Sequence, residues 1–308
     1  MPIATNRKST IVLNTVRLAA LRAANRVGGQ FAPDATARRA ARLLCTPFAA
    51  GRLRARDADD GGASHETMQV DGRRVAVYRW GDPAVQPRVL LAHGWSSYAL
   101  RFLPWVRALR EAGYAVIAFD QPGHGRSDAG RCTMACFAQT LRAVAARHGP
   151  FEAIVGHSMG GAAAMLALAD GAVAKRAVLI APAADPDAAT TRFARRVGLV
   201  GGMVPRIQRL LEKQTGTTVR ALTAHVRVPA LAVPALVIHD LADAEVPWEE
   251  GESYARLWPG ALLLSTTGLG HNRIVNDPAI IEAGLRFLHG EEVGERVVSS
   301  PNLPFGVA

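Results

Sequence analysis

The sequence contains little cysteine, with three residues among 308. Three cysteines cannot form the multiple cross-links of a disulfide scaffold. They form no Cys-x-x-Cys pair and have no partner histidine at the spacing of a zinc finger. We therefore expect reduced thiols and no bound metal. These residues are Cys45, Cys132 and Cys136.

Long apolar runs are also missing. The N-terminal stretch over 10–27 has the spacing of a helix, but Arg17, Arg22 and Arg26 interrupt it, so it cannot span a bilayer. No uninterrupted apolar segment followed by an A-x-A site is present, so we expect no cleaved secretory signal. Together with reduced thiols, these absences favour a cytoplasmic location.

Acidic residues are nearly absent from the first 56 positions. Asp34 is the one acid there beside eleven arginine and lysine residues, whereas 57–308 hold 25 basic and 25 acidic residues. The whole formal net charge of +10 therefore belongs to the start of the chain. The rest lacks the basic excess of a nucleic-acid-binding domain, so no nucleic-acid partner is expected.

Residues 1–65 are predicted to form a basic helical arm, with a second Arg-rich helix over about 35–44. Two interpretations stay open for it. Its helices either lie on the main domain with solvated arginines, or present a basic amphipathic surface to anionic lipid or another protein. If the main domain folds alone, deletion of residues 1–56 is expected to leave its chemistry intact and to remove any binding to anionic surfaces.

What the sequence does have is a regular alternation of apolar runs and amphipathic stretches over 66–289, within a chain that is 49% apolar. Asp71-Gly72 separates two short strands in the manner of a hairpin. The later apolar runs are continuous, which is typical of parallel strands buried on both faces. The predicted strands are 66–70, 73–80, 89–92, 115–119, 153–155, 177–180, 236–239 and 262–266. The predicted helices are 100–112, 132–148, 159–170, 248–257 and 278–288, followed by a tail over 290–308.

One interval interrupts this alternation. Between Pro182 and Pro234 no strand-like run occurs, and helix-like pieces lie at 188–199, 205–213 and 218–225. We expect a small helical cap inserted at about 186–230, over the carboxyl ends of the strands, where open α/β sheets bind ligands. Its Val, Leu and Met content would suit an apolar pocket. A purely structural helical insert is the alternative.

The strongest chemical signal is Gly156-His157-Ser158-Met159-Gly160. It follows an apolar run and precedes a stretch of small residues, so a strand, a sharp turn and a helix are predicted around Ser158. This is the context of a G-x-S-x-G nucleophile elbow. The turn lifts the hydroxyl clear of the sheet, and the helix N-terminus aims N–H groups at developing negative charge.

A serine nucleophile needs a base, and the base needs an orienting acid. Among nine histidines, His271 follows the last predicted strand, at the carboxyl edge of the sheet that also holds Ser158. Asp243 lies three residues past the 236–239 strand at the same edge, with Asp240 and Glu245 as rivals for the acid.

The order of these residues resembles the α/β-hydrolase fold superfamily. The segment 93–95 (HGW) looks like the oxyanion loop of that family, and 120–127 (DQPGHGRS) looks like its D-x-P-G-H-G-x-S turn. The segment 239–247 (HDLADAEVP) is similar to its acid loop, where the catalytic acid precedes Val-Pro by two residues, which selects Asp243. The resemblance covers about 66–289 and implies an α/β fold with a mostly parallel eight-stranded sheet flanked by helices and a small helical cap.

The resemblance also implies roles. Ser158 attacks an acyl carbonyl, His271 takes its proton, Asp243 orients the imidazole, and the N–H groups of Trp95 and Met159 bind the oxyanion. The expected function is hydrolysis of a small-molecule carboxylic ester through an acyl-enzyme, without cofactor or metal. The alternatives are a C–C bond (diketone) hydrolase, an amidase or peptidase, an acyltransferase, and a non-catalytic ligand-binding protein. The 120–127 turn is expected to shape loops rather than do chemistry.

Overall fold

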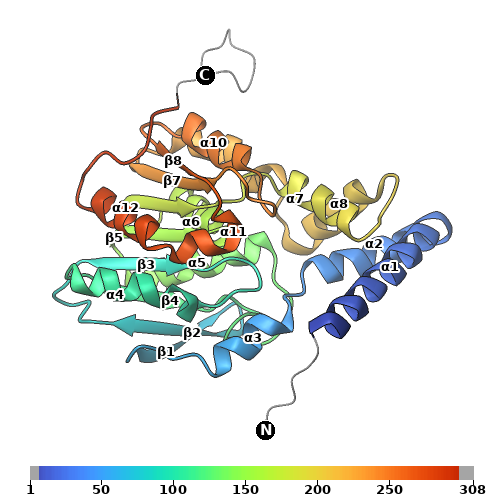
Figure 1. The fold of residues 1–308 in the computed structure, drawn as a ribbon, viewed down its shortest axis with the longest axis horizontal. Coiled ribbons are helices and arrows are strands. Elements are labelled where there is room, and N and C mark those ends of the chain that lie inside the picture. Colours follow the sequence, from blue (N-terminus) through green and yellow to red (C-terminus); the bar gives the residue numbers. More distant parts are fainter. Residues whose placement is uncertain (1–6, 298–308) are drawn as a thin grey trace. The chain divides into compact units, whose positions relative to one another are not determined.

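The computed structural model describes residues 7–297, with side chains from residue 16 onward; the end of the predicted tail lies outside the described residues. The chain forms two compact units (Figure 1). The first contains residues up to Cys45 together with Pro186–Val219, and the second contains Thr46–Asp185 and the residues from Arg220 onward. No helix among the described residues is long and apolar enough to cross a bilayer.

The second unit contains an eight-stranded sheet in the order β1-β2-β4-β3-β5-β6-β7-β8. β1 and β2 form an antiparallel hairpin, β2 pairs antiparallel with β4, and all other pairs are parallel. The predicted, mostly parallel sheet is therefore confirmed. The strands are β1 (Ser64–Val70), β2 (Arg73–Trp80), β3 (Arg88–Ala92), β4 (Ala115–Phe119), β5 (Phe151–His157), β6 (Ala174–Ile180), β7 (Ala235–Asp240) and β8 (Leu262–Thr266).

The central strands are buried on both faces, as their continuous apolar runs predict. In β3, Leu90 packs in one core while its neighbours Val89 and Leu91 pack in the other. Helices α5 (Met134–His148), α6 (Met159–Ala169) and α10 (Trp248–Leu257) close the first core, and α4 (Leu103–Glu111) and α12 (Pro278–Leu288) close the second. Figure 1 shows these helices on the two faces of the sheet.

Some predicted helices have different bounds. The predicted 100–112 helix begins as a 3-10 turn, η1 (Ala99–Phe102), and becomes α4 where Pro104 occupies the first helical turn. The predicted 132–148 helix begins only at Met134, because Thr133 caps it. The predicted 218–225 helix is wrong, because the chain there forms three short helical pieces between Arg220 and Ala230. These pieces are η2 (Arg220–Leu222), α9 (Ala224–Arg227) and η3 (Val228–Ala230).

Three further short helices were not predicted: α3 (Ala49–Arg56), α11 (Gly270–Arg273) and η4 (Ile274–Asn276). Of these, α3 belongs to the second unit and packs within it. A Cβ at Gly51 of α3 would lie 2.2 Å from the carbonyl oxygen of Ser96, so only glycine allows the helix to approach that loop so closely.

The first unit is helical and combines two segments that are distant in sequence. α1 (Arg7–Phe31) and α2 (Pro33–Leu44) come from the N-terminal segment, and α7 (Pro186–Arg196) and α8 (Met203–Thr215) come from the insertion. The apolar side chains of the insertion are buried against alanines of α2. This cluster contains Ala37, Ala40, Ala41, Ala194, Val197, Leu199, Met203 and Ile207.

The first helix extends past the point where the 10–27 prediction ends. Gly28 and Gly29 stay helical, and the Ala32 N–H donates to the Gly28 carbonyl at 2.8 Å. The reason is close packing, because a Cβ at Gly28 would lie 2.6 Å from the Thr36 hydroxyl of α2. The glycine serves helix contact here rather than a turn.

Candidate active site

Ser158 occupies a sharp turn between a strand and a helix, as the sequence predicts. β5 ends at His157 and α6 begins at Met159, so Ser158 alone makes the connection. Its backbone has φ +55° and ψ −122°, a conformation that L side chains rarely adopt. This strained backbone presents the hydroxyl at the carboxyl end of β5.

The two motif glycines are required by close backbone approach. A Cβ at Gly156 would lie 2.6 Å from the Gly160 carbonyl oxygen, and a Cβ at Gly160 would lie 2.2 Å from the carbonyl oxygen of Ala92. Contacts this short are sterically forbidden, so any larger residue would push α6 away from β5 and β3. The glycines therefore seat the helix N-terminus directly behind Ser158.

Ser158, His271 and Asp243 form one hydrogen-bonded chain. Nε2 of His271 lies 2.9 Å from the Ser158 hydroxyl oxygen, and Nδ1 lies 2.7 Å from Oδ2 of Asp243. All three are at least nine-tenths buried, with exposed fractions of 9%, 8% and 9% for Ser158, His271 and Asp243. Because a carboxylate can only accept, Nδ1 carries the proton and Nε2 is free to accept one from the serine.

Asp243 is held as a carboxylate by several donors. Burial alone would raise its pKa, but hydrogen bonds from His239 and His271, and from the Val246 N–H, lower the pKa below its ordinary value. Nε2 of His239 lies 3.5 Å from Oδ2 and donates to the Val246 carbonyl at 3.0 Å. Nothing in the sequence indicates the contact of His239 with Asp243.

The two rival acids point elsewhere. Asp240 accepts hydrogen bonds from the Thr266 hydroxyl at 2.8 Å and the Leu269 N–H at 2.9 Å, so it braces the loop that carries His271. Glu245 accepts from the Asn272 side chain at 2.6 Å on the exposed side of the same loop. Of the three candidate carboxylates, Asp243 is the one that meets the imidazole.

His157 contacts the loop that carries His271. Its Nε2–H donates to the backbone carbonyl of His271 at 2.9 Å, and the two rings lie 4.8 Å apart. Burial, then the neighbouring His271, hold the pKa of His157 well below its ordinary value, so the ring stays neutral. Arg101 also reaches this loop, donating to the backbone and side-chain oxygens of Asn272. Neither contact leaves a recognisable local pattern in the sequence.

The predicted oxyanion loop lies beside the serine. A Cβ at Gly94 would come within 3.0 Å of the Ser158 Cβ, so the 93–95 segment runs against Ser158. Met159 is the first residue of α6, where N–H groups have no acceptor within the helix. The residue before α3 holds this loop in place, since the Phe48 N–H donates to the Ser96 hydroxyl at 2.9 Å.

The 120–127 turn is a buried hydrogen-bond network. Asp120 accepts from the Tyr78 hydroxyl at 2.7 Å, from the Ala99 N–H at 2.7 Å and from the Arg126 N–H at 2.8 Å. A Cβ at Gly125 would lie about 2.0 Å from the same carboxyl group. These contacts use the Asp120 oxygens for holding backbone, in keeping with a loop-shaping role.

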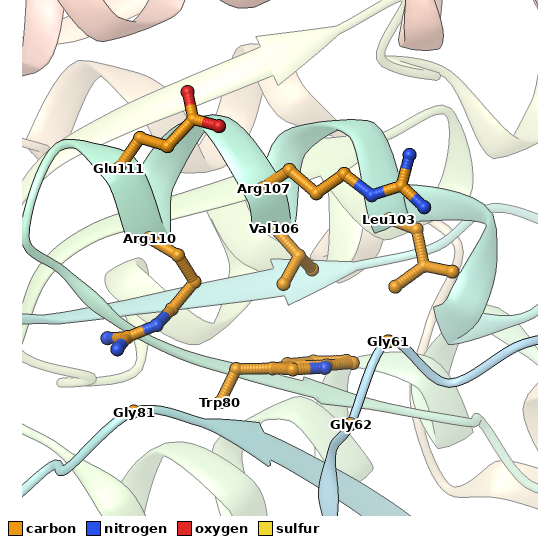
Figure 2. Close-up of a pocket in the computed structure, with 9 residues that line it drawn as sticks. All are labelled: Gly61, Gly62, Trp80, Gly81, Leu103, Val106, Arg107, Arg110 and Glu111. Atoms are coloured by element: carbon orange, nitrogen blue, oxygen red, sulfur yellow. The ribbon is translucent and has the colours of Figure 1, made fainter.

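A separate surface hollow of about 380 Å³ lies away from this site (Figure 2). Figure 2 shows the Trp80 ring facing Leu103 and Val106 of α4. Trp80 pairs with Val116 near the amino end of β4, whereas Ser158 follows the carboxyl end of β5. The hollow and Ser158 therefore lie at opposite ends of the parallel strands. Within residues 7–297, no group of three or more His, Cys, Asp or Glu side chains is placed to hold a metal ion.

The chain is similar to several known hydrolases. The family model described as serine aminopeptidase, S33, matches residues 83–229. The putative carbamate hydrolase RutD of Variovorax paradoxus is 27% identical over 248 residues, covering 68% of this chain and 93% of that protein. A monoacylglycerol lipase of Mycolicibacterium smegmatis is 34% identical over 109 residues, covering 32% of this chain and 39% of the lipase.

A solved structure extends the likeness to the fold as a whole. The esterase RhEst1 from Rhodococcus sp. ECU1013 matches with a TM-score of 0.52 at 23% identity, covering 74% of this chain and 98% of the esterase. Together these matches support a hydrolase of this fold type. With its eight-stranded sheet and its strand–serine–helix turn, the chain is a member of the α/β-hydrolase fold superfamily.

Proposed function

We propose that the protein is a serine hydrolase that cleaves carboxylic esters of small molecules. The observation that carries the proposal is the buried chain from the Ser158 hydroxyl through His271 to Asp243, with links of 2.9 and 2.7 Å. Both links lie within the range for general-base catalysis. An unactivated serine is a poor nucleophile, and this arrangement supplies the base and the orienting acid that it needs.

The geometry fits a two-step reaction. Ser158 attacks the ester carbonyl while Nε2 of His271 takes its proton, and Asp243 stabilises the imidazolium that forms. The N–H groups of Trp95 and Met159 are proposed to bind the oxyanion, each contributing about 3–4 kcal/mol to the transition state. His271 then protonates the leaving alcohol, and a water activated by the same histidine releases the acid from the acyl-enzyme.

An ester substrate is favoured by two matched proteins, described as a lipase and an esterase. A carbamate is the second candidate, because the relative that covers 68% of this chain is described as a putative carbamate hydrolase. The same nucleophile and oxyanion site would serve a carbamate carbonyl. Amide, diketone and acyl-transfer substrates remain the further alternatives to be separated by experiment.

A substrate panel with active-site labelling tests the proposal. A fluorophosphonate probe should label the native protein, and labelling should be lost in Ser158→Ala. p-Nitrophenyl esters of increasing acyl length should be hydrolysed faster than matched carbamates, anilides and a diketone. Faster turnover of the carbamate would select the second candidate, and labelling of Ser158→Ala would assign the nucleophile to another residue.

Three carboxylate variants test the acid. Asp243→Asn should lower kcat by about 10⁴, because the imidazole loses the partner that fixes its tautomer. Glu245→Gln is the matched control and should retain activity, since the amide can still accept from Asn272. If Asp240→Asn abolishes turnover while Asp243→Asn keeps it, the assignment of the acid is wrong.

A further inference from the structure

Cys132 and Cys136 lie outside the site described above, at the start of α5. Thr133 between them is the N-cap of the helix, and its hydroxyl accepts from the Cys136 N–H at 3.2 Å. The two sulfur atoms are 2.6 Å apart. A disulfide bond is about 2.05 Å long, so a small side-chain adjustment brings the sulfurs to bonding distance.

A fixed positive charge faces one of the two thiols. Arg73, the first residue of β2, donates from Nη2 to the Cys136 sulfur at 3.0 Å and from Nη1 to the Arg131 carbonyl at 3.0 Å. The hydrogen bond with Cys132, followed by the Arg73 guanidinium, holds the pKa of Cys136 below its ordinary value despite burial. The N-terminal turn of α5 favours the same thiolate.

The two thiols differ in access as well as in charge. Cys132 is 2% exposed, and burial raises its pKa, whereas Cys136 is partly exposed. A reagent in solution therefore meets the more nucleophilic sulfur first, with the second sulfur already in contact behind it. This is the arrangement of an attacking and a resolving cysteine.

We propose that Cys132 and Cys136 form a redox-active dithiol, which closes to an intramolecular disulfide when a hydroperoxide oxidises Cys136. The Cys136 thiolate attacks one oxygen of hydrogen peroxide: an S–O bond forms, the O–O bond breaks, and hydroxide leaves and takes a proton to become water. The Cys132 thiol then attacks the sulfenic sulfur, forming the S–S bond. The S–O bond breaks, and its oxygen leaves as water with the Cys132 proton.

The electron count closes, because the two thiols lose two electrons and the peroxide gains two. A thiol reductant reverses the step. The Arg73 guanidinium lies against the Cys136 sulfur, and its positive charge stabilises a thiolate there and repels a metal cation. Within the described part of the chain, no third ligand joins the two sulfurs to hold a metal.

The test is mass spectrometry of the full-length protein. The reduced protein is treated with a small excess of hydrogen peroxide, unfolded in guanidinium chloride, blocked with iodoacetamide and digested with trypsin. Unfolding comes before the block because Cys45 and Cys132 are buried in the folded protein. Both cysteines fall in one tryptic peptide, 132–142, and Cys45 falls in another, 43–52. The 132–142 peptide should appear unalkylated and two hydrogens lighter, reverting with dithiothreitol, while the 43–52 peptide remains alkylated.

Variants separate the two roles. Cys132→Ser should leave a sulfenic acid on Cys136 that dimedone traps, whereas Cys136→Ser should give no dimedone adduct on Cys132. Arg73→Gln should slow alkylation of Cys136 at pH 5 by about tenfold, because below the pKa of both proteins a rise of one pKa unit lowers the thiolate fraction about tenfold. Arg74→Gln is the matched control, because Arg74 pairs with Asp128 instead and should leave the rate unchanged.

The proposal is overturned if peroxide leaves both cysteines of the 132–142 peptide alkylated. It is also overturned if Cys45 oxidises as fast as Cys136, or if the oxidised protein contains only disulfides between chains. The wild-type mass measurement needs no variant, so it stands even where Arg73→Gln impairs folding.

Discussion

Three histidines buried around the proposed site should make the second unit sensitive to mild acid. His93 illustrates the cause. Its Nδ1–H donates to the Gly94 carbonyl at 2.7 Å, and its Nε2 accepts from the Gln121 N–H at 3.0 Å. Both ring nitrogens are thus committed in the neutral form, and a proton on Nε2 would face the Gln121 N–H. Burial lowers the pKa of His93 to about 4.

His124 and His157 are held in the same way. Nδ1–H of His124 donates to the Pro122 carbonyl at 3.0 Å, and burial lowers its pKa to about 3. His157 donates to the backbone carbonyl of His271, and burial lowers its pKa well below the ordinary value. All three rings are thus neutral in the folded protein across the range in which exposed histidines take up protons.

The sign and size of the effect follow from proton linkage. Below about pH 6.5 the unfolded chain binds protons that the folded chain does not, so stability falls as the pH falls. Between about pH 7 and 5.5 each of the three histidines costs about 1.2 kcal/mol, or about 4 kcal/mol together. Carboxylates with lowered pKa, such as Asp243, lose their contribution only as the pH falls below about 4, outside this window.

Urea unfolding followed by tryptophan fluorescence measures this loss. All five tryptophans lie in the second unit, so the signal reports that unit alone. The extrapolated free energy of unfolding should be about 4 kcal/mol lower at pH 5.5 than at pH 7. In His124→Asn, the amide can still donate to Pro122 but does not titrate, so the loss should shrink by about a third. A wild-type loss below about 1 kcal/mol would refute the reasoning.

Two further predictions concern packing. Gly160→Ala should destabilise the second unit by about 1–3 kcal/mol and lower turnover of the proposed ester substrates, because its Cβ meets the Ala92 carbonyl oxygen. Gly29→Ala has open space around the new Cβ and should leave the midpoint of thermal unfolding nearly unchanged. Deletion of residues 1–45 should expose the apolar face of α7 and α8 and promote aggregation on gel filtration. Deletion of 1–56 should also cut activity, because it removes α3 from the Ser96 loop; equal activity of both truncations would contradict this role.

The structure divides the basic N-terminal segment between the two units. Residues 1–56 carry the whole net charge, and the sequence predicts that they can be deleted without loss of the chemistry of the main domain. In the structure, α3 belongs to the second unit, and Arg52 of α3 donates to the Ser127 carbonyl at 2.7 Å. α1 and α2 pack with the insertion instead. The charge distribution therefore located the basic segment but could not divide it, because packing partners distant in the sequence leave no local pattern.

The elbow around Ser158 was predictable because its causes are local. An apolar run, two glycines at fixed spacing and a helix-forming stretch define the turn within about ten residues, and the backbone follows. The positions of the parallel strands along the chain follow from similar local runs. These features depend on steric limits and periodicity that neighbouring residues impose on one another.

The choice of acid shows what the residues alone leave open. Asp240, Asp243 and Glu245 lie within six positions, and their own sequence allows any of them to face the imidazole. The tertiary structure turns Asp240 to Thr266 and Glu245 to Asn272, leaving Asp243 against His271. The catalytic roles of Ser158, His271 and Asp243 stay predictions, which the variants above test.

Local sequence patterns predict the strands, most of the helices that cover them, the turn at Ser158 and the place of the charge. Which side chains meet depends on how the chain packs in three dimensions. Ser158 and His271 are 113 residues apart, and Arg73 and Cys136 are 63 apart. Local backbone preferences select a conformation for each segment, but contacts at such separations are fixed only when the sheet and its covering helices close the core.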